Sequence, residues 1–209
     1  MAALKSLQPE ISSHLKGAPT TTVVSYIRRA ARQLARDSGI WEKNLGSVEV
    51  NSSTEILELD VPSVDPSIDE NWEADFELPT DSALLRISKV MLGDDEASSS
   101  YYNYDQVQGK LLVSPNLLKE TQTLAVYGIL IPSIDAATIP DFLVNSGSEA
   151  IVAYAIWEMM RMPDQVWSSA GQAWMFKKQY DNRLSEMTVD NARGFTEQSI
   201  TLPPTPFTG

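Results

Sequence analysis

Three kinds of side chain in this sequence could do chemistry: one histidine, two acidic clusters and a group of arginines. His14 could act as a general base, but a base needs a positioned partner, and the polar residues around it offer none. A solvated surface histidine is the simpler interpretation. The sequence has no cysteine and no G-x-S-x-G motif, so thiol and serine nucleophiles have no support either. We therefore predict no catalytic residue and no enzymatic activity.

The acidic clusters raise the question of a metal site. Asp94-Asp95-Glu96 and Asp65…Asp69-Glu70 could bind a hard cation through oxygen, but neither has the spacing of a calcium loop. Solvated turns explain them better. Phosphate-binding loops of the G-x-x-x-x-G-K-[ST] or G-x-G-x-x-G type do not occur in the sequence. We expect no metal and no cofactor.

The arginines are concentrated in one segment. Arg28, Arg29, Arg32 and Arg36 are four of only 16 cationic residues in an acidic chain. Helical spacing places Arg28, Arg32 and Arg36 in a row. The row is either a solvated helix face or a contact with an acidic surface of a neighbouring copy or partner, since guanidinium groups pair well with carboxylates. The sequence leaves both interpretations open.

Two further segments are candidates for contacts. Aromatic and methionine side chains gather in residues 154–176, where helical spacing accounts for them as core, although a minority could be exposed at a subunit contact. The segment LPPTPF near the C-terminus is either disordered or a docking arm, because extended proline segments lose little entropy on binding. The candidate contact residues of that arm are Leu202, Pro203, Pro204, Pro206 and Phe207.

The elements that would position these residues follow from periodicity. Helical spacing predicts a helix over 19–39, with Thr20 or Thr21 as N-cap and Gly39 as its end. Two more helices are predicted over 138–162 and 164–188, closed into a hairpin at Met162-Pro163. Between them, β-branched and aromatic runs separated by turn residues predict antiparallel strands at 48–50, 54–60, 83–91, 100–105, 110–113 and 121–131.

These elements predict an α+β fold. The first helix has no obvious partner except the last two, so we expect a helical bundle of residues 19–44 and 134–190, with a β subdomain of residues 45–133 inserted. Residues 1–18 are expected to be a flexible segment, and residues 191–209 an extended arm. Residues 60–79, acidic and broken by prolines, are expected to form a surface loop.

The charge of the chain limits its partners. The formal net charge is −12, which disfavours wrapping by nucleic acid and adsorption to anionic membranes. The N-terminus lacks the apolar core of a signal peptide, and no run of apolar residues is long enough to span a bilayer. The absence of cysteine is compatible with folding in a reducing cytoplasm. These features predict a soluble protein without a targeting segment.

The order of several segments resembles a known family. They are TTTVVSYIRRAARQLARDSGIW, FELPTDSALLRISKVMLGD, GKLLVSP, LAVYGILIPS, IPDFLVNSGSEAIVAYAIWEMMRMPDQVW and AWMFKKQYDNRLSEM. Together they resemble the head-to-tail adaptor (connector, head completion) proteins of tailed bacteriophages, in particular those of short-tailed phages. The likeness covers roughly residues 20–195. The acidic loop 60–79 and the NSGSEA sequence at 145–150, inside a predicted helix, depart from it.

The resemblance implies a structural virion protein. Such a protein forms a ring, typically of twelve copies, that docks on the portal protein, extends the DNA channel and provides the platform for tail (nozzle or tail-tube) proteins. DNA would pass through without specific binding, and the protein would reside at the head-tail junction of the virion and in the host cytoplasm during assembly. The alternative from the residues alone is a β-rich ligand-binding, carbohydrate-binding or hydrolytic virion or cell-surface module. A third is a soluble domain without an assembly role.

Overall fold

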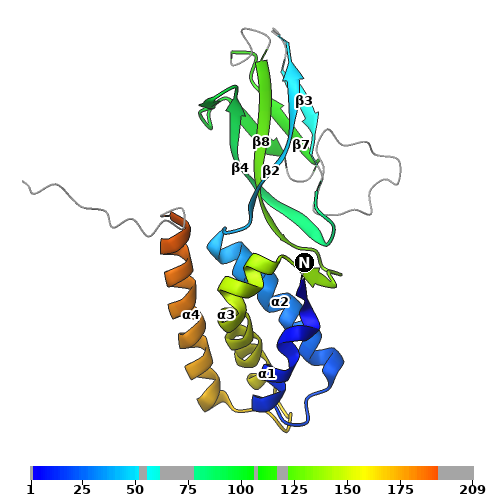
Figure 1. The fold of residues 1–209 in the computed structure, drawn as a ribbon, viewed down its shortest axis with the longest axis vertical. Coiled ribbons are helices and arrows are strands. Elements are labelled where there is room, and N and C mark those ends of the chain that lie inside the picture. Colours follow the sequence, from blue (N-terminus) through cyan, green and yellow to red (C-terminus); the bar gives the residue numbers. More distant parts are fainter. Residues whose placement is uncertain (1, 52–55, 62–77, 106–107, 117–121, 193–209) are drawn as a thin grey trace, which may run out of the picture.

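The structure is a computed structural model, and it describes residues 2–51, 56–61, 78–105, 108–116 and 122–192. These residues form helices and antiparallel sheets, which confirms the predicted α+β class. Figure 1 shows an elongated molecule with the helices at one end and the sheets at the other. In the described part of the chain, no helix is long and apolar enough to cross a membrane.

The helices form a bundle from both ends of the chain. Its members are α1 (Gln8–His14), α2 (Thr20–Ser38), α3 (Asp141–Met160) and α4 (Ala170–Ala192). A single hydrophobic core joins them, so residues such as Ile27 of α2 and Ile151 of α3 are fully buried together. The β region enters the chain between α2 and α3, as expected.

The prediction of a flexible segment at residues 1–18 is wrong. A short strand β1 (Ala2–Ala3) pairs with β9 (Thr138–Ile139), and a 3-10 helix, η1 (Leu4–Leu7), leads into α1. The side chains of Leu4, Leu7, Ile11 and Leu15 are buried in the bundle core. Burying four large apolar side chains stabilises the segment by several kcal/mol, at about 1.5–3 kcal/mol each, which outweighs its loose composition.

Helix α2 ends as predicted. Gly39 follows it in the left-handed conformation, with φ of 60°, and donates its N–H to the carbonyl of Ala35. This is the usual position of glycine after a helix. At the other end the N-cap is Pro19 instead of Thr20 or Thr21, because the helix already begins at Thr20.

Helices α3 and α4 pack as an antiparallel hairpin, although both begin later than predicted. Thr138 and Ile139 belong to β9, and the turn between the helices extends to residue 169. The NSGSEA sequence does not interrupt α3. Instead, Gly147 is buried where α2 and α4 approach: a Cβ there would lie 2.6 Å from Leu34 and 3.4 Å from Met187. The absence of a side chain lets three helices pack closely.

The β subdomain contains two antiparallel sheets around a second core. One has the order β2-β8-β4-β5 and the other β3-β7-β6. The second core is formed by apolar side chains of both sheets, including Leu84, Val113 and Val126. The strands are β2 (Glu42–Val50), β3 (Leu57–Asp60), β4 (Ser82–Leu92), β5 (Asp95–Glu96), β6 (Tyr102–Asp105), β7 (Lys110–Val113) and β8 (Gln122–Pro132).

The six predicted strands follow the order of β2, β3, β4, β6, β7 and β8, and the predicted strands 100–105 and 110–113 form the β6–β7 pair. The β subdomain begins at Glu42, three residues earlier than expected. Most of the predicted acidic loop, residues 62–77, lies outside the described residues, as do residues 193–209 of the predicted arm. Residues 191 and 192 belong to α4.

Candidate assembly surfaces

The arginine row of α2 faces the chain that leaves the β subdomain. Arg28 donates from Nε to the carbonyl of Ala136, at 2.7 Å, and from a terminal nitrogen to the carbonyl of Ile134, at 3.3 Å. Arg32 donates to the carbonyl of Pro132, at the end of β8. These bonds within the chain were not predicted from the sequence. Arg32 ties α2 to the end of β8, and Arg28 ties α2 to the connection that follows β8.

The other two arginines differ from this pair. Arg29 forms an ion pair with Glu158 of α3, with 3.1 Å between Nε and Oε2, and its side chain is 64% exposed. Arg36 is exposed and has no ion pair within the described residues. Burial, and then the charge of Arg36, lower the pKa of Arg32. Of these four arginines, Arg36 alone has no bonded partner among the described residues, so its guanidinium group is available to a carboxylate from outside.

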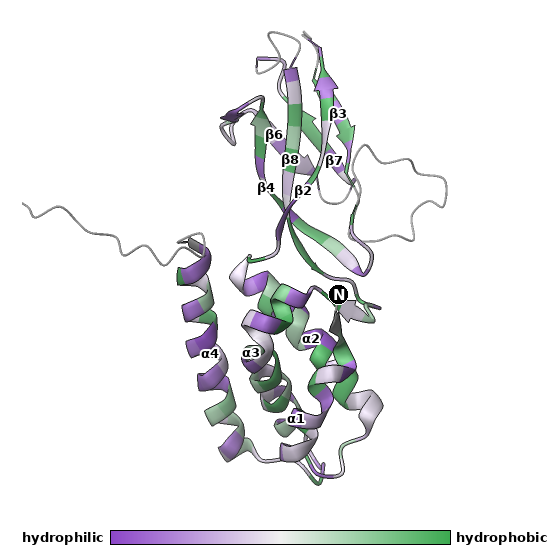
Figure 2. Ribbon diagram, viewed as in Figure 1, coloured by the Kyte–Doolittle hydropathy of each residue, from purple (hydrophilic) through white to green (hydrophobic). Residues whose placement is uncertain are grey.

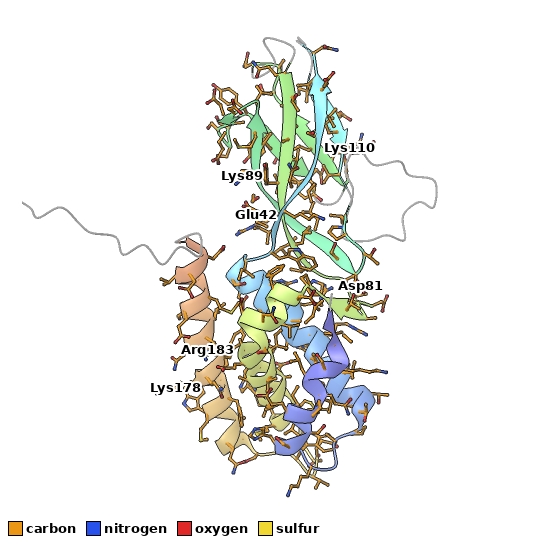
Figure 3. The ribbon with its side chains drawn as sticks, in the orientation of Figure 1. Glu42, Asp81, Lys89, Lys110, Lys178 and Arg183 are labelled. Carbon is orange, nitrogen blue, oxygen red and sulfur yellow. The ribbon has the colours of Figure 1, made fainter. Side chains whose placement is uncertain are left out.

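An aspartate holds the same junction from the side of the sheets. Asp81 precedes β4 with φ of 62°, a left-handed conformation that aspartate tolerates better than most residues. Its carboxylate accepts bonds from the backbone N–H, at 3.0 Å, and the hydroxyl of Thr138. Figure 3 places Asp81 between the sheets and the helices.

The environment of Asp81 favours its charged form. The hydrogen bond from the Thr138 hydroxyl is the main cause that lowers the pKa of Asp81, and the positive charge of Arg28 lowers it further, while burial opposes both. Our sequence reasoning missed this residue. The left-handed backbone and the contact with a residue 57 positions away have no local signal in the sequence. We call Arg28, Arg32, Asp81 and their partners the junction latch.

Helix α4 is the second candidate surface, and here the predicted core is partly wrong. The buried residues of α4 are Ala173, Tyr180 and Met187, one in every seven. By contrast, Trp174 is 69% exposed and Met175 is 66% exposed, and Val166, in the preceding turn, is 93% exposed. Trp174 and Met175 belong to the 154–176 group expected as core, of which a minority was left open for exposure at a subunit contact. We call Val166, Trp174 and Met175 the α4 outer face.

The exposure follows from the position of α4. The helix lies on the outside of the bundle and packs along one narrow line, so its remaining surface faces solvent. In Figure 2, α4 carries both hydrophilic and hydrophobic residues along its length. Large apolar side chains gathered on one exposed segment are typical of protein contacts, since isolated ones are common but groups are not.

Polar contacts attach α4 firmly despite its narrow packing. The Tyr180 hydroxyl donates to the carboxylate of Asp37 in α2, at 2.8 Å. Burial, together with this hydrogen bond and the charge of Asp37, raises the pKa of Tyr180 far above its ordinary range. Arg183 pairs with Glu149 of α3, at 2.6 Å, and with Glu186. The α4 outer face is therefore presented by a fixed helix.

The remaining sequence candidates do not come together. His14 is exposed and meets the ring of Phe176 edge-on, at 5.3 Å between centroids, with no acid or nucleophile bonded to it among the described residues. Asp94, Asp95 and Glu96 are exposed at the β4–β5 turn. Within the described ranges, no group of three or more acidic or histidine side chains could hold a metal ion. Asp65, Asp69, Glu70 and the predicted contact residues of 202–207 lie outside those ranges.

The acidic charge is divided unequally between the two halves. Residues 42–133, which include the β subdomain, hold 17 acidic and 5 basic side chains. Residues 1–41 and 134–192, which form the bundle, hold ten of each. The whole excess of negative charge therefore belongs to the β region, and the bundle is neutral.

No protein-family model matches the chain, and a search of the curated proteins gives no match.

Proposed function

We propose that this chain is a structural virion protein, a head-to-tail adaptor that forms a ring on the portal of a tailed phage, extends the DNA channel and supports the tail proteins. The observation that carries the proposal is the α4 outer face: Trp174 and Met175 are exposed on a helix that Tyr180 bonds to α2, and Val166 is exposed in the turn before it. Exposing a group of large apolar side chains to water is unfavourable unless a partner protein covers them. A function in assembly explains why these side chains are exposed.

The distribution of charge supports the same function. Copies that assemble through their bundles bring neutral surfaces together, so long-range repulsion does not oppose the contact. The β region keeps its excess of carboxylates, which repel the phosphates of DNA that passes nearby. A conduit for DNA needs this combination, because attraction to the wall would slow the passage of DNA.

The test is a mass measurement of the purified protein, alone and mixed with the portal rings of the same phage. An adaptor is expected to be a monomer or small oligomer alone and to add to the portal as a ring of about twelve copies. Electron microscopy of the complex should show the ring below the portal. A protein that never binds portal rings, but binds a glycan or a small ligand in solution, would refute the adaptor function and support the ligand-binding alternative.

A further inference from the structure

We infer that the α4 outer face is the place where a second copy of this chain docks, and that the contact is head-to-tail: Val166, Trp174 and Met175 of one copy pack on the bundle of the next copy around Ile134. This inference rests on the proposed ring, because a closed ring requires two different surfaces on each copy. If no second copy docked there, the α4 outer face would stay exposed to solvent in the ring.

The composition of the face suits an interface core. Tryptophan and methionine are enriched at protein interfaces, and tryptophan is among the residues that contribute most to binding. The three exposed side chains offer roughly 400 Å² of apolar surface, given that an aromatic side chain alone buries about 150–250 Å². A stable contact buries about 800 Å² on each partner. The face can therefore supply the apolar centre of such a contact, and polar residues around it the rest.

Charge favours a second copy as the occupant. The bundle holds equal numbers of acidic and basic residues, so two bundles meet without net repulsion, whereas a contact through the β region would bring two strongly acidic surfaces together. Next to Trp174 and Met175, the exposed Lys178 adds a positive charge on the outer side of α4 (Figure 3).

The same bundle carries a surface that complements this face. Ile134, in the connection between β8 and β9, is 72% exposed, and Asp135 beside it is exposed as well. An apolar side chain next to an aspartate matches an apolar face next to a lysine. Ile134 follows the end of β8 by two residues, next to the β subdomain, whereas α4 begins at the far end of the bundle (Figure 1). Two complementary surfaces at different places on one chain produce a head-to-tail contact.

The absence of cysteine makes this contact directly measurable, because one introduced cysteine is the only thiol in the chain. We would prepare Met175→Cys and Ile134→Cys, and follow maleimide labelling of each in the monomer and in the portal-bound ring. Both thiols should become at least about tenfold less reactive in the ring. Ile56→Cys is the matched control, since Ile56 is 62% exposed in the β subdomain and its thiol should keep its reactivity.

Cross-linking identifies the occupant. A mixture of Met175→Cys and Ile134→Cys should form a disulfide between two copies of the chain under mild oxidation. In parallel, Trp174→Ser should weaken the self-association of concentrated protein, measured by ultracentrifugation, about 30-fold, the loss typical of an interface hot spot. Ile56→Ser should change it less than twofold.

Three results would overturn the inference. If rings form on the portal while the Met175→Cys thiol stays fully reactive, the docking surface is elsewhere and the adaptor function stands. If Met175→Cys cross-links only to the portal or a tail protein, the occupant is not a second copy. If it cross-links only to Met175→Cys of another copy, the contact is two-fold and not head-to-tail. A fourth result would separate the inference from the proposed function. If no portal binding occurs but concentrated protein gives the disulfide between Met175→Cys and Ile134→Cys, the docking of a second copy stands and the adaptor function fails.

Discussion

The junction latch makes a clear prediction about Arg28. Replacement by methionine keeps the aliphatic stem of the side chain but removes the donors to Ala136 and Ile134. Because Ala136 is fully buried, water is poorly placed to replace the donor at its carbonyl. A buried acceptor left without a partner costs about 1–3 kcal/mol, and bonds from charged donors are at the upper end of that range. We expect Arg28→Met to lower the free energy of unfolding by about 2 kcal/mol.

The assay is urea unfolding at neutral pH, followed by thermal unfolding. At this chain length, about 2 kcal/mol corresponds to a fall of about 4–8 °C in Tm. The bundle and the β subdomain have separate cores, so loss of the latch should also separate their unfolding. Circular dichroism at 222 nm follows the helices, and tyrosine or tryptophan fluorescence follows both halves.

Another arginine of the same helix provides the control. Arg36→Met removes the same group, but Arg36 is exposed and has no ion pair among the described residues. Exposed substitutions away from buried contacts usually change stability by less than about 0.5 kcal/mol, so this variant should unfold almost like the original chain. Equal losses from Arg28→Met and Arg36→Met would contradict the latch. Unchanged stability of Arg28→Met together with lost ring formation would favour an interface role for Arg28.

Three further predictions concern stability. Tyr180→Phe removes the hydrogen bond to Asp37 and should lower the free energy of unfolding by about 1.5–2 kcal/mol, measured with urea. Because burial and Asp37 raise the pKa of Tyr180 in the folded state, the original chain loses stability as pH rises above about 10, and the variant should lose less. Asp81→Asn should lower the free energy of unfolding at pH 7. Since the hydrogen bond from Thr138 is the main cause that lowers the pKa of Asp81, the original chain loses the stabilisation from the charged carboxylate below about pH 4, and the stability of the variant should fall less steeply in acid. Gly147→Ala should destabilise by about 1 kcal/mol in thermal unfolding, because overpacking against a buried leucine of α2 exceeds the helix propensity gained; a more stable variant would refute the close approach.

Local signals explain which parts of the fold could be predicted. Helix α2 combines a regular apolar stripe with a glycine stop, and both act within the helix itself, so its limits were found to one residue. Strands β4 and β8 are long runs rich in apolar residues that pair with each other, and their positions were also found within a residue or two. In each case a local sequence pattern, the spacing of apolar residues along the helix or along the strand, is enough to predict the element.

The N-terminal segment had a signal that the composition concealed. Leu4, Leu7, Ile11 and Leu15 follow helical spacing and form the face that packs on the bundle. Polar residues and a proline lie between them, so the segment reads as loose when its average hydropathy is considered. Spacing was the better guide, because a short amphipathic helix needs only one apolar side to be held by a larger body.

Helix α4 shows the opposite case, in which periodicity cannot decide. Apolar residues occur around most of its first two turns, so several faces fit a helical stripe equally well. The structure packs the face of Ala173, Tyr180 and Met187, and Trp174 and Met175 are left outside. The choice depends on Asp37, which binds Tyr180, and on Glu149, which binds Arg183. Both partners belong to other helices, so no reading of α4 alone could supply the answer.

The proposed ring requires each two-part copy to hold a constant shape. Two separate cores joined by a short connection would allow the β subdomain to move on the bundle, because apolar contacts have little directionality. The junction latch opposes this motion with directed hydrogen bonds from Arg28 and Arg32 on one side and to Asp81 on the other. In a closed ring every copy repeats the same geometry, so an angular error in one copy is multiplied around the circle. In the proposed ring, Arg28 and Arg32 would therefore serve assembly indirectly, because their bonds restrain the angle between the two halves of each copy.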